Sequence, residues 1–213
     1  MTGLRERKKA RTRSGISAAA IALFLERGYD QVSVAEVAEA AEVSKRTLFA
    51  YFPTKDDLVL HRFADHEDEP ARVVRTRPAG VAPLAALHEH LRAALGRRDP
   101  ITGLCDVPEV VRFYRLVVDT PALSAALVRY HARGEDALAD ALSEAVPDGG
   151  SALTARLAAG QILSVLRTLA HANQSRIAAG TAADVVAPEA LAEADHAFAL
   201  LGSGLAPYRS PAR

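Results

Sequence analysis

The sequence predicts an all-α protein with a small N-terminal head and a larger helical body. Apolar residues recur at three- and four-residue spacing along most of the chain, which is the period of amphipathic helices. Serines and prolines stand before several of these runs, at positions that begin helices. Almost no stretch alternates apolar and polar residues as a half-buried strand would. With 213 residues, of which 49% are hydrophobic, the chain can bury a core in one large or two small domains.

The most specific local pattern lies at residues 33–52, which we interpret as two short helices joined by a tight turn. Ser33 suits an N-cap because its hydroxyl can accept a hydrogen bond from the amide of Glu36. Glu36 can return that bond and complete a Ser-x-x-Glu capping box. Ser44 suits a second N-cap, with Thr47 three residues later. The spacing therefore predicts a helix-turn-helix motif.

The second helix of this motif carries cations and hydrogen-bond donors on its first turn, namely Lys45, Arg46 and Thr47. Leu48 and Phe52 place apolar side chains on the opposite face. A Lys or Arg side chain can bond guanine O6 and N7, and the methyl group of Thr can contact a thymine methyl. A helix that begins in this way suits the major groove of DNA, so the motif predicts sequence-specific DNA binding.

The N-terminus is strongly basic, although the whole chain has 26 Lys and Arg against 26 Asp and Glu. Residues 1–13 carry a net charge of +5, so residues 14–213 carry −5. We expect residues 1–12 to form an arm that is disordered when free and ordered on DNA. Contacts with phosphates or the minor groove are expected from Lys8, Lys9, Arg11 and Arg13.

Residues 12–58 resemble the N-terminal domain of the TetR family of bacterial transcriptional repressors. Four stretches carry the resemblance in order and spacing: residues 16–24 with Ala19-Ala20, 26–29 (Glu-Arg-Gly-Tyr), 33–34 (Ser-Val) and 43–55 (Val-Ser-Lys-Arg-Thr-Leu-Phe-Ala-Tyr-Phe-Pro-Thr-Lys). The resemblance implies a three-helix DNA-binding domain at residues 13–54 and a helical effector-binding and dimerisation domain at residues 55–205.

The resemblance also implies which side chains contact double-stranded DNA. They are Ser33, Ser44, Lys45, Arg46, Thr47, Phe49, Tyr51 and Lys55. Lys55 would bond a phosphate from the start of the following helix, so that its loss would weaken binding to all sequences alike. Two positions depart from the family. Glu42 stands in the turn where glycine is common, and a left-handed φ there costs a non-glycine residue roughly 1–2 kcal/mol. Phe49 replaces the commoner tyrosine and lacks its hydroxyl.

Apolar spacing predicts further helices after the motif. They cover residues 55–66, 83–97, 108–118, 121–146, 151–179 and 188–205. Residues 70–82 have the composition of a loop or a weak helix, and residues 147–150 that of a firm turn. Gly180 suits a C′ position, and Pro188 suits the first position of the last helix. We expect residues 206–213 to be a disordered tail.

The last two predicted helices are long and broadly apolar. TetR-family dimers are built from their last two long helices, so the resemblance implies a twofold-symmetric homodimer and a pseudo-palindromic operator. The alternative is that these helices bury their apolar faces within one subunit. The candidate interface residues are Leu157, Leu163, Leu166, Leu191, Phe198 and Leu201.

The resemblance further implies that the body binds a small effector, which releases a repressor from its operator. A pocket needs an apolar lining with a few polar anchors. The candidates are polar or aromatic residues inside otherwise apolar helices: Phe113, Tyr114, Tyr130, His131, Gln161, His171 and Asn173. Each of them could instead be an ordinary core or surface residue.

The sequence gives less support to other classes of function. We expect neither an enzyme nor a cofactor, because no catalytic or nucleotide-binding motif is present. His61 and Asp65 have the spacing of metal ligands on a helix, but two ligands do not make a site, so a metal-responsive regulator is only an alternative. A second alternative is a DNA-binding architectural protein without an effector. A single cysteine, Cys105, fits a reducing bacterial cytoplasm, and no apolar run approaches the roughly 20 residues that span a bilayer.

Overall fold

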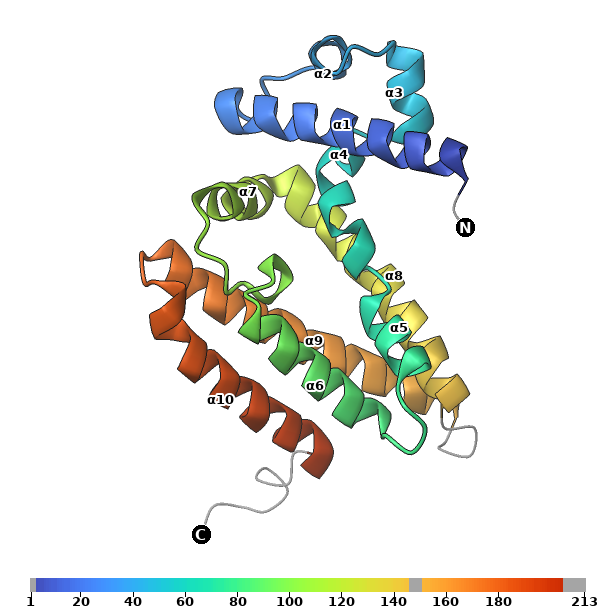
Figure 1. The fold of residues 1–213 in the computed structure, drawn as a ribbon, viewed down its shortest axis with the longest axis vertical. Coiled ribbons are helices and arrows are strands. Elements are labelled where there is room, and N and C mark those ends of the chain that lie inside the picture. The colour runs from blue at the N-terminus through green and yellow to red at the C-terminus, as the bar shows by residue number, and fades with distance from the viewer. Residues whose placement is uncertain (1–2, 146–150, 205–213) are drawn as a thin grey trace. The chain divides into compact units, whose positions relative to one another are not determined.

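Helices make up all the regular secondary structure of the described residues, 3–145 and 151–204, in a computed structural model of the chain (Figure 1). The α-helices are α1 (Leu4–Arg27), α2 (Val34–Ala40), α3 (Lys45–Tyr51), α4 (Asp57–Leu60), α5 (Glu69–Thr76), α6 (Pro83–Gly96), α7 (Pro108–Asp119), α8 (Pro121–Ala145), α9 (Ala152–Ala178) and α10 (Ala183–Ser203). Two 3₁₀ segments, η1 (His61–His66) and η2 (Pro100–Thr102), join them. The all-α prediction is confirmed. The predicted turn at 147–150 and tail at 206–213 lie outside the described residues.

The chain divides into two compact units. The head unit comprises Met1–Asp65 and Arg112–Tyr130, and the body unit comprises His66–Val111 and His131–Arg213. Helices α7 and α8 each contribute residues to both units. This division differs from the predicted boundary at residue 54, because residues 55–65 and 112–130 belong to the head unit.

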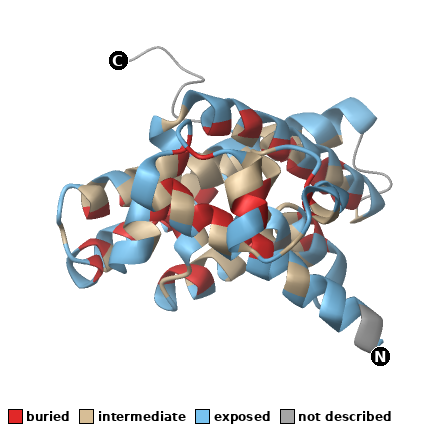
Figure 2. Ribbon diagram, turned by 90° about the horizontal axis from the view of Figure 1, so that it is seen from above, coloured by how far each residue is buried: buried red, intermediate tan, exposed pale blue. Residues whose placement is uncertain are grey.

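The head unit is built around α1, which lies against α2 and α4, while α2 packs on α3. Each helix contributes buried side chains, including Phe24 of α1, Val37 of α2, Leu48 of α3 and Leu58 of α4, all at most 1% exposed. Ser17 adds a buried hydrogen bond, because its hydroxyl donates to the carbonyl of Leu58 at 2.6 Å. Figure 2 shows that buried positions lie on one side of most helices and exposed positions on the other. The motif helices are therefore held by one apolar face each.

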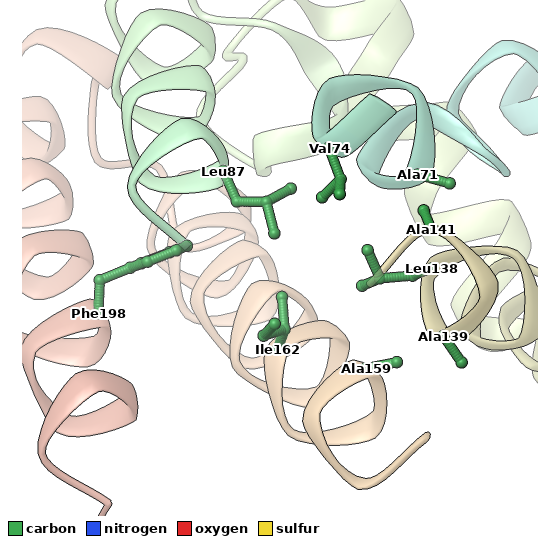
Figure 3. Packing of buried hydrophobic residues seen from close by; sticks show 9 residues of the cluster. All are labelled: Ala71, Val74, Leu87, Leu138, Ala139, Ala141, Ala159, Ile162 and Phe198. Atoms are coloured by element: carbon green, nitrogen blue, oxygen red, sulfur yellow. The ribbon is translucent and has the colours of Figure 1, made fainter. Parts of the chain in front are cut away.

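The body unit packs α6 against α10 and α5, and α9 against α10. Figure 3 shows Val74 of α5, Leu87 of α6, Leu138 of α8 and Ile162 of α9 converging on one core. Phe198 of α10 belongs to the same cluster. A second cluster joins the end of α6 to the C-terminal half of α9 and the first turns of α10. No helix among the residues that the structure describes has the length and apolar character needed to cross a membrane.

The contact between η2 and α9 requires a glycine. Gly103 has a φ of 73°, and a Cβ on it would lie 2.0 Å from the carbonyl oxygen of Ala170. Any larger residue at position 103 would therefore push η2 away from α9.

Three predicted elements differ from the structure. Residues 69–76 form the helix α5, where we expected a loop or a weak helix. The predicted helix 55–66 is instead a single turn, α4, followed by the 3₁₀ segment η1. The N-terminal basic residues are not a separate disordered arm, because α1 begins at Leu4 and includes them.

The last helix also begins earlier than predicted. α10 begins at Ala183, so Pro188 lies inside it instead of at its first position. Asp106, from the loop before α7, supplies the missing cap: its Oδ2 accepts a hydrogen bond from the amide of Ala183 at 2.8 Å. Asp184 in the first turn also pairs with Arg98. These distant contacts start the helix where no local capping residue exists.

Candidate nucleic-acid interface

The start of α2 has the predicted capping box. The hydroxyl of Ser33 accepts from the amide of Glu36 at 3.3 Å, and the amide of Ser33 donates to Oε2 of Glu36 at 2.8 Å. Arg27 pairs with the other carboxylate oxygen of Glu36 at 2.7 Å. Hydrogen bonds from the Ser33 amide and hydroxyl, followed by Arg27, lower the pKa of Glu36 to about 2. The end of α1 and the start of α2 are thus joined by one ionised carboxylate.

The turn between the motif helices keeps its geometry without glycine. Glu42 is exposed and has a φ of 53°, which confirms the left-handed conformation expected at this position. The amide of Val43 donates to the carbonyl of Ala38 at 2.9 Å and closes the turn. The cost of roughly 1–2 kcal/mol at Glu42 is therefore part of the folded head.

α3 presents one buried and one exposed face. Ser44 caps it as predicted, since its hydroxyl accepts from the amide of Thr47 at 3.0 Å. Leu48 is 1% exposed, whereas Lys45 and Arg46 are exposed on the first turn. Phe49 follows them at 49% exposure. The cations and Phe49 thus lie on the solvent side of a helix that its other face fixes to the head.

The predicted contact residues of α1 are all exposed, namely Lys8, Lys9, Arg11 and Arg13. Arg13 also lies over the ring of Phe52, with 5.3 Å between its guanidinium carbon and the ring centroid. The four residues therefore extend α1 as a cationic helical surface, and Arg13 in addition packs on the end of the motif.

Lys55 is turned toward the interior of the head. Its Nζ donates to the carbonyl oxygen of Tyr29 at 2.5 Å and lies 4.1 Å from the centroid of the Tyr29 ring. The hydroxyl of Tyr29 donates to the carboxylate of Asp56, and Arg129 of α8 lies 3.6 Å from the same carboxylate. Sequence reasoning missed Tyr29, Asp56 and Arg129, because no local spacing connects residues so far apart in the chain.

The predicted pocket residues of the head unit gather around a side chain that we had not selected. Phe63 lies 5.6 Å from Phe113, 6.0 Å from Tyr114 and 5.9 Å from Tyr130, measured between ring centroids. The hydroxyl of Tyr130 donates to the carbonyl of Phe63. The four rings form an aromatic cluster within the head unit.

The predicted pocket residues of the body unit do not share one cavity. Gln161 and His171 are exposed in the single chain, and Gln161 lines an open groove on α9. Burial, followed by the charge of Arg167, lowers the pKa of His131 to about 4. Asn173 is 2% exposed and its Nδ2 donates to the carbonyl of Thr102 at 3.0 Å.

Only part of the predicted dimer surface is free in the single chain. Phe198 is 4% exposed and stacks on His88 at 4.7 Å between ring centroids, so it belongs to the interior and not to an interface. The half-buried residues Leu163, Leu166, Leu191 and Leu201 pack partly against the two body clusters. Leu157 is 57% exposed. An open groove beside it runs along α9, lined by Leu153, Gly160 and Ser164 among others.

Sequence comparison places the head among known proteins. Residues 16–61 match the profile of bacterial regulatory proteins of the tetR family. The chain is 38% identical over 138 residues to the HTH-type transcriptional regulator TcmR of Streptomyces glaucescens, covering 64% of this chain and 61% of TcmR. It is 35% identical over 97 residues to the HTH-type transcriptional regulator RutR of Escherichia coli K12, covering 44% of each. The chain thus spans less than two thirds of the length of these relatives.

Solved structures share the fold at lower identity. NalD of Pseudomonas aeruginosa, the secondary repressor of the MexAB-OprM efflux pump, superposes with a TM-score of 0.58 at 18% identity, over 89% of this chain and 96% of NalD. A putative TetR-family regulator of Mesorhizobium loti gives a TM-score of 0.56 at 21% identity, over 90% and 96%. Residues 16–61 thus match the tetR family of bacterial regulatory proteins, and the chain has the all-α fold of these solved regulators.

Proposed function

We propose that this protein is a sequence-specific DNA-binding transcriptional regulator that represses its target and is released by a small-molecule effector. One observation carries the DNA-binding part. Lys45 and Arg46 are exposed on the first turn of α3, while Leu48 of the same helix is 1% exposed and fixes it to the head. A fixed helix with free cations at its start is suited to the major groove. The names of the curated relatives support this proposal.

Residues on α3, at the starts of the two motif helices and on α1 have proposed roles on double-stranded DNA. Lys45, Arg46 and Thr47 contact base edges. Phosphate contacts come from Ser33, Ser44 and Tyr51 around the motif, and from Lys8, Lys9 and Arg11 on α1. Phe49 contributes apolar contact, since it has no hydroxyl for a phosphate. The solvent exposure of the three α1 cations and of Phe49 supports these roles.

The proposed partner in solution is a second copy of the chain. The exposed leucines Leu153 and Leu157 of α9 line an open groove, where the apolar face of a second helix could pack. A twofold-symmetric dimer would bind two half-sites of a pseudo-palindromic operator.

The effector is proposed to act by shifting the equilibrium between DNA-binding and non-binding states. Its coupling free energy with DNA would be about 1–3 kcal/mol, as is typical of two-site systems. The aromatic cluster around Phe63 is the candidate region in the head unit, and His131 and Asn173 are the candidates in the body unit.

The experiment is selection of bound duplexes from a random library, followed by gel-shift binding at two salt concentrations with a panel of small apolar metabolites. The proposal predicts enrichment of a pseudo-palindrome, and release by one class of compound. Selective binding that no compound disturbs would favour an effector-independent architectural protein. Binding without any sequence preference would contradict the role of α3.

A further inference from the structure

The ammonium group of Lys55 already has its partners within the head unit. Its Nζ donates to the carbonyl oxygen of Tyr29 at 2.5 Å and lies over two aromatic faces, 4.1 Å from the Tyr29 centroid and 5.3 Å from the Phe24 centroid. A cation held over a ring is attracted to it, and more strongly where water is excluded. Tyr29 is 7% exposed and Phe24 1% exposed, so Lys55 reaches into a partly desolvated site.

Other contacts hold Tyr29 in the position that Lys55 uses. Its ring lies 5.0 Å from that of Phe24, and its hydroxyl donates to Asp56. Burial, followed by that bond to Asp56, raises the pKa of Tyr29, so the hydroxyl keeps its proton and remains a donor. Arg129 pairs with the other side of the Asp56 carboxylate at 3.6 Å. If Lys55 moved out to a phosphate, the Tyr29 carbonyl would lose its donor and both rings their cation.

The residue that Lys55 holds lies in the turn before the motif. Gly28 ends α1 with a φ of 89°, and Tyr29 follows it. The chain then reaches Ser33, the N-cap of α2. The ion pair between Arg27 and Glu36 joins the end of α1 to the start of α2. α2 in turn packs on α3. The Lys55–Tyr29 bond therefore helps to fix the turn between α1 and α2, and α2 supports the reading helix α3.

We propose that Lys55 is a positioning residue that acts on DNA binding through Tyr29 and does not bond a DNA phosphate. This assignment rests on the proposed function, and it replaces the phosphate contact implied by the family resemblance.

The test compares Lys55→Met with Lys9→Met. Both variants lose one charge and keep a linear apolar side chain, but Lys9 is exposed on α1 and has a proposed phosphate contact. Binding to the selected duplex is measured over a range of salt concentrations. For Lys9→Met we expect the slope of log K against log salt to flatten by about one for each protomer bound. For Lys55→Met we expect an unchanged slope and an affinity about threefold to tenfold lower at every salt concentration.

Two further readouts separate positioning from charge. Lys55→Met should lower the melting temperature by about 2–4 °C without DNA, whereas Lys9→Met should leave it unchanged. In a double-mutant cycle with Tyr29→Leu, the double variant should bind DNA no more weakly than the weaker single variant. A slope that flattens for Lys55→Met as much as for Lys9→Met would overturn the assignment. So would a Lys55→Met protein with unchanged affinity and melting temperature. A wild-type protein without selective binding, or an unchanged slope for Lys9→Met, would instead count against the proposed function itself.

Discussion

The proposed reading helix α3 and the last helix α10 begin for different physical reasons. α3 begins at its own Ser44, whose hydroxyl accepts from the amide of Thr47 three residues later. α10 begins after Ala182, which has no capping side chain, and Asp106, 77 positions earlier in the chain, accepts from the amide of Ala183. The start of α3 can be found in the sequence, whereas the start of α10 exists only after the body has folded.

Both helices pack through a buried side chain. The largest expected change in unfolding free energy comes from truncating Phe198, the buried side chain of α10. Phe198→Ala should lower the free energy of unfolding by about 3–5 kcal/mol, because Phe198 is 4% exposed in the body core. Leu157→Ala is the matched control, since Leu157 is 57% exposed. It should leave subunit stability nearly unchanged and weaken self-association. Denaturant unfolding and sedimentation velocity measure the two quantities. The interior position of Phe198 would be contradicted if Phe198→Ala weakened association alone.

Removing the capping side chain of each helix tests the difference between the local cap and the distant cap. Ser44→Ala and Asp106→Ala should each cost about 1 kcal/mol of unfolding free energy, within the range of about 0.5–2 kcal/mol for lost N-caps. Hydrogen exchange shows where the helix is loosened. Exchange should rise at the amide of Thr47 in the first variant and at the amide of Ala183 in the second. If Asp106→Ala left the exchange of Ala183 unchanged, the distant cap would not be what starts α10.

The body should also lose stability in mild acid. The pKa of His131 is lowered to about 4, whereas an unfolded histidine titrates near 6.5. Between these values the unfolded state binds more protons, so stability is complete above about pH 6.5 and falls as the pH drops toward about 4. The loss should be on the order of 1 kcal/mol, because His131 is partly exposed and solvent screens its charge.

A second group extends this loss at lower pH. Hydrogen bonds from His66 and then from His90 hold the pKa of Glu69 below its usual value of 4.5. The stabilisation that Glu69 provides is therefore complete above about pH 4.5 and is lost as the pH falls below this value. His131→Gln should therefore flatten the dependence of the melting temperature on pH between about 6.5 and 4.5 and leave the drop below it. An equally steep dependence in His131→Gln would assign the upper window to another group.

The smallest expected effect concerns backbone strain. Glu42 in the head has a φ of 53°, and Arg98 in the body has a φ of 54°. Glu42→Gly should raise the free energy of unfolding by about 0.5–1 kcal/mol, because glycine adopts this conformation without a steric cost. Arg98→Gly should gain less, since it also removes the ion pair with Asp184. Thermal unfolding of both variants measures the difference, and a lower melting temperature for Glu42→Gly would mean that Glu42 makes a stabilising contact.

The predictions that succeeded depend on residues close together in the chain. The capping box of Ser33, the cap of Ser44 and the strained turn at Glu42 are each set within about one helical turn of sequence. The alternation of exposed and buried residues along α3 follows from helical periodicity in the same way.

The features that the sequence does not predict depend on tertiary contacts. The long α10 needs Asp106, and the inward position of Lys55 needs the carbonyl and ring of Tyr29. In the sequence Phe63 is one apolar residue of the predicted helix 55–66, because its aromatic partners come from α7 and α8. Phe198 fits the pattern of an interface and that of a core equally well, and only the packing of α6 against α10 distinguishes them.

The most direct test of the reading role of α3 is binding of the double variant Lys45→Ala/Arg46→Ala to the selected duplex at two salt concentrations. Each lost base contact should cost about 1–3 kcal/mol, so we expect affinity to fall at least tenfold and sequence preference to collapse, with the fold unchanged by circular dichroism. Retention of full affinity and full sequence preference would show that α3 is not the helix that recognises the operator.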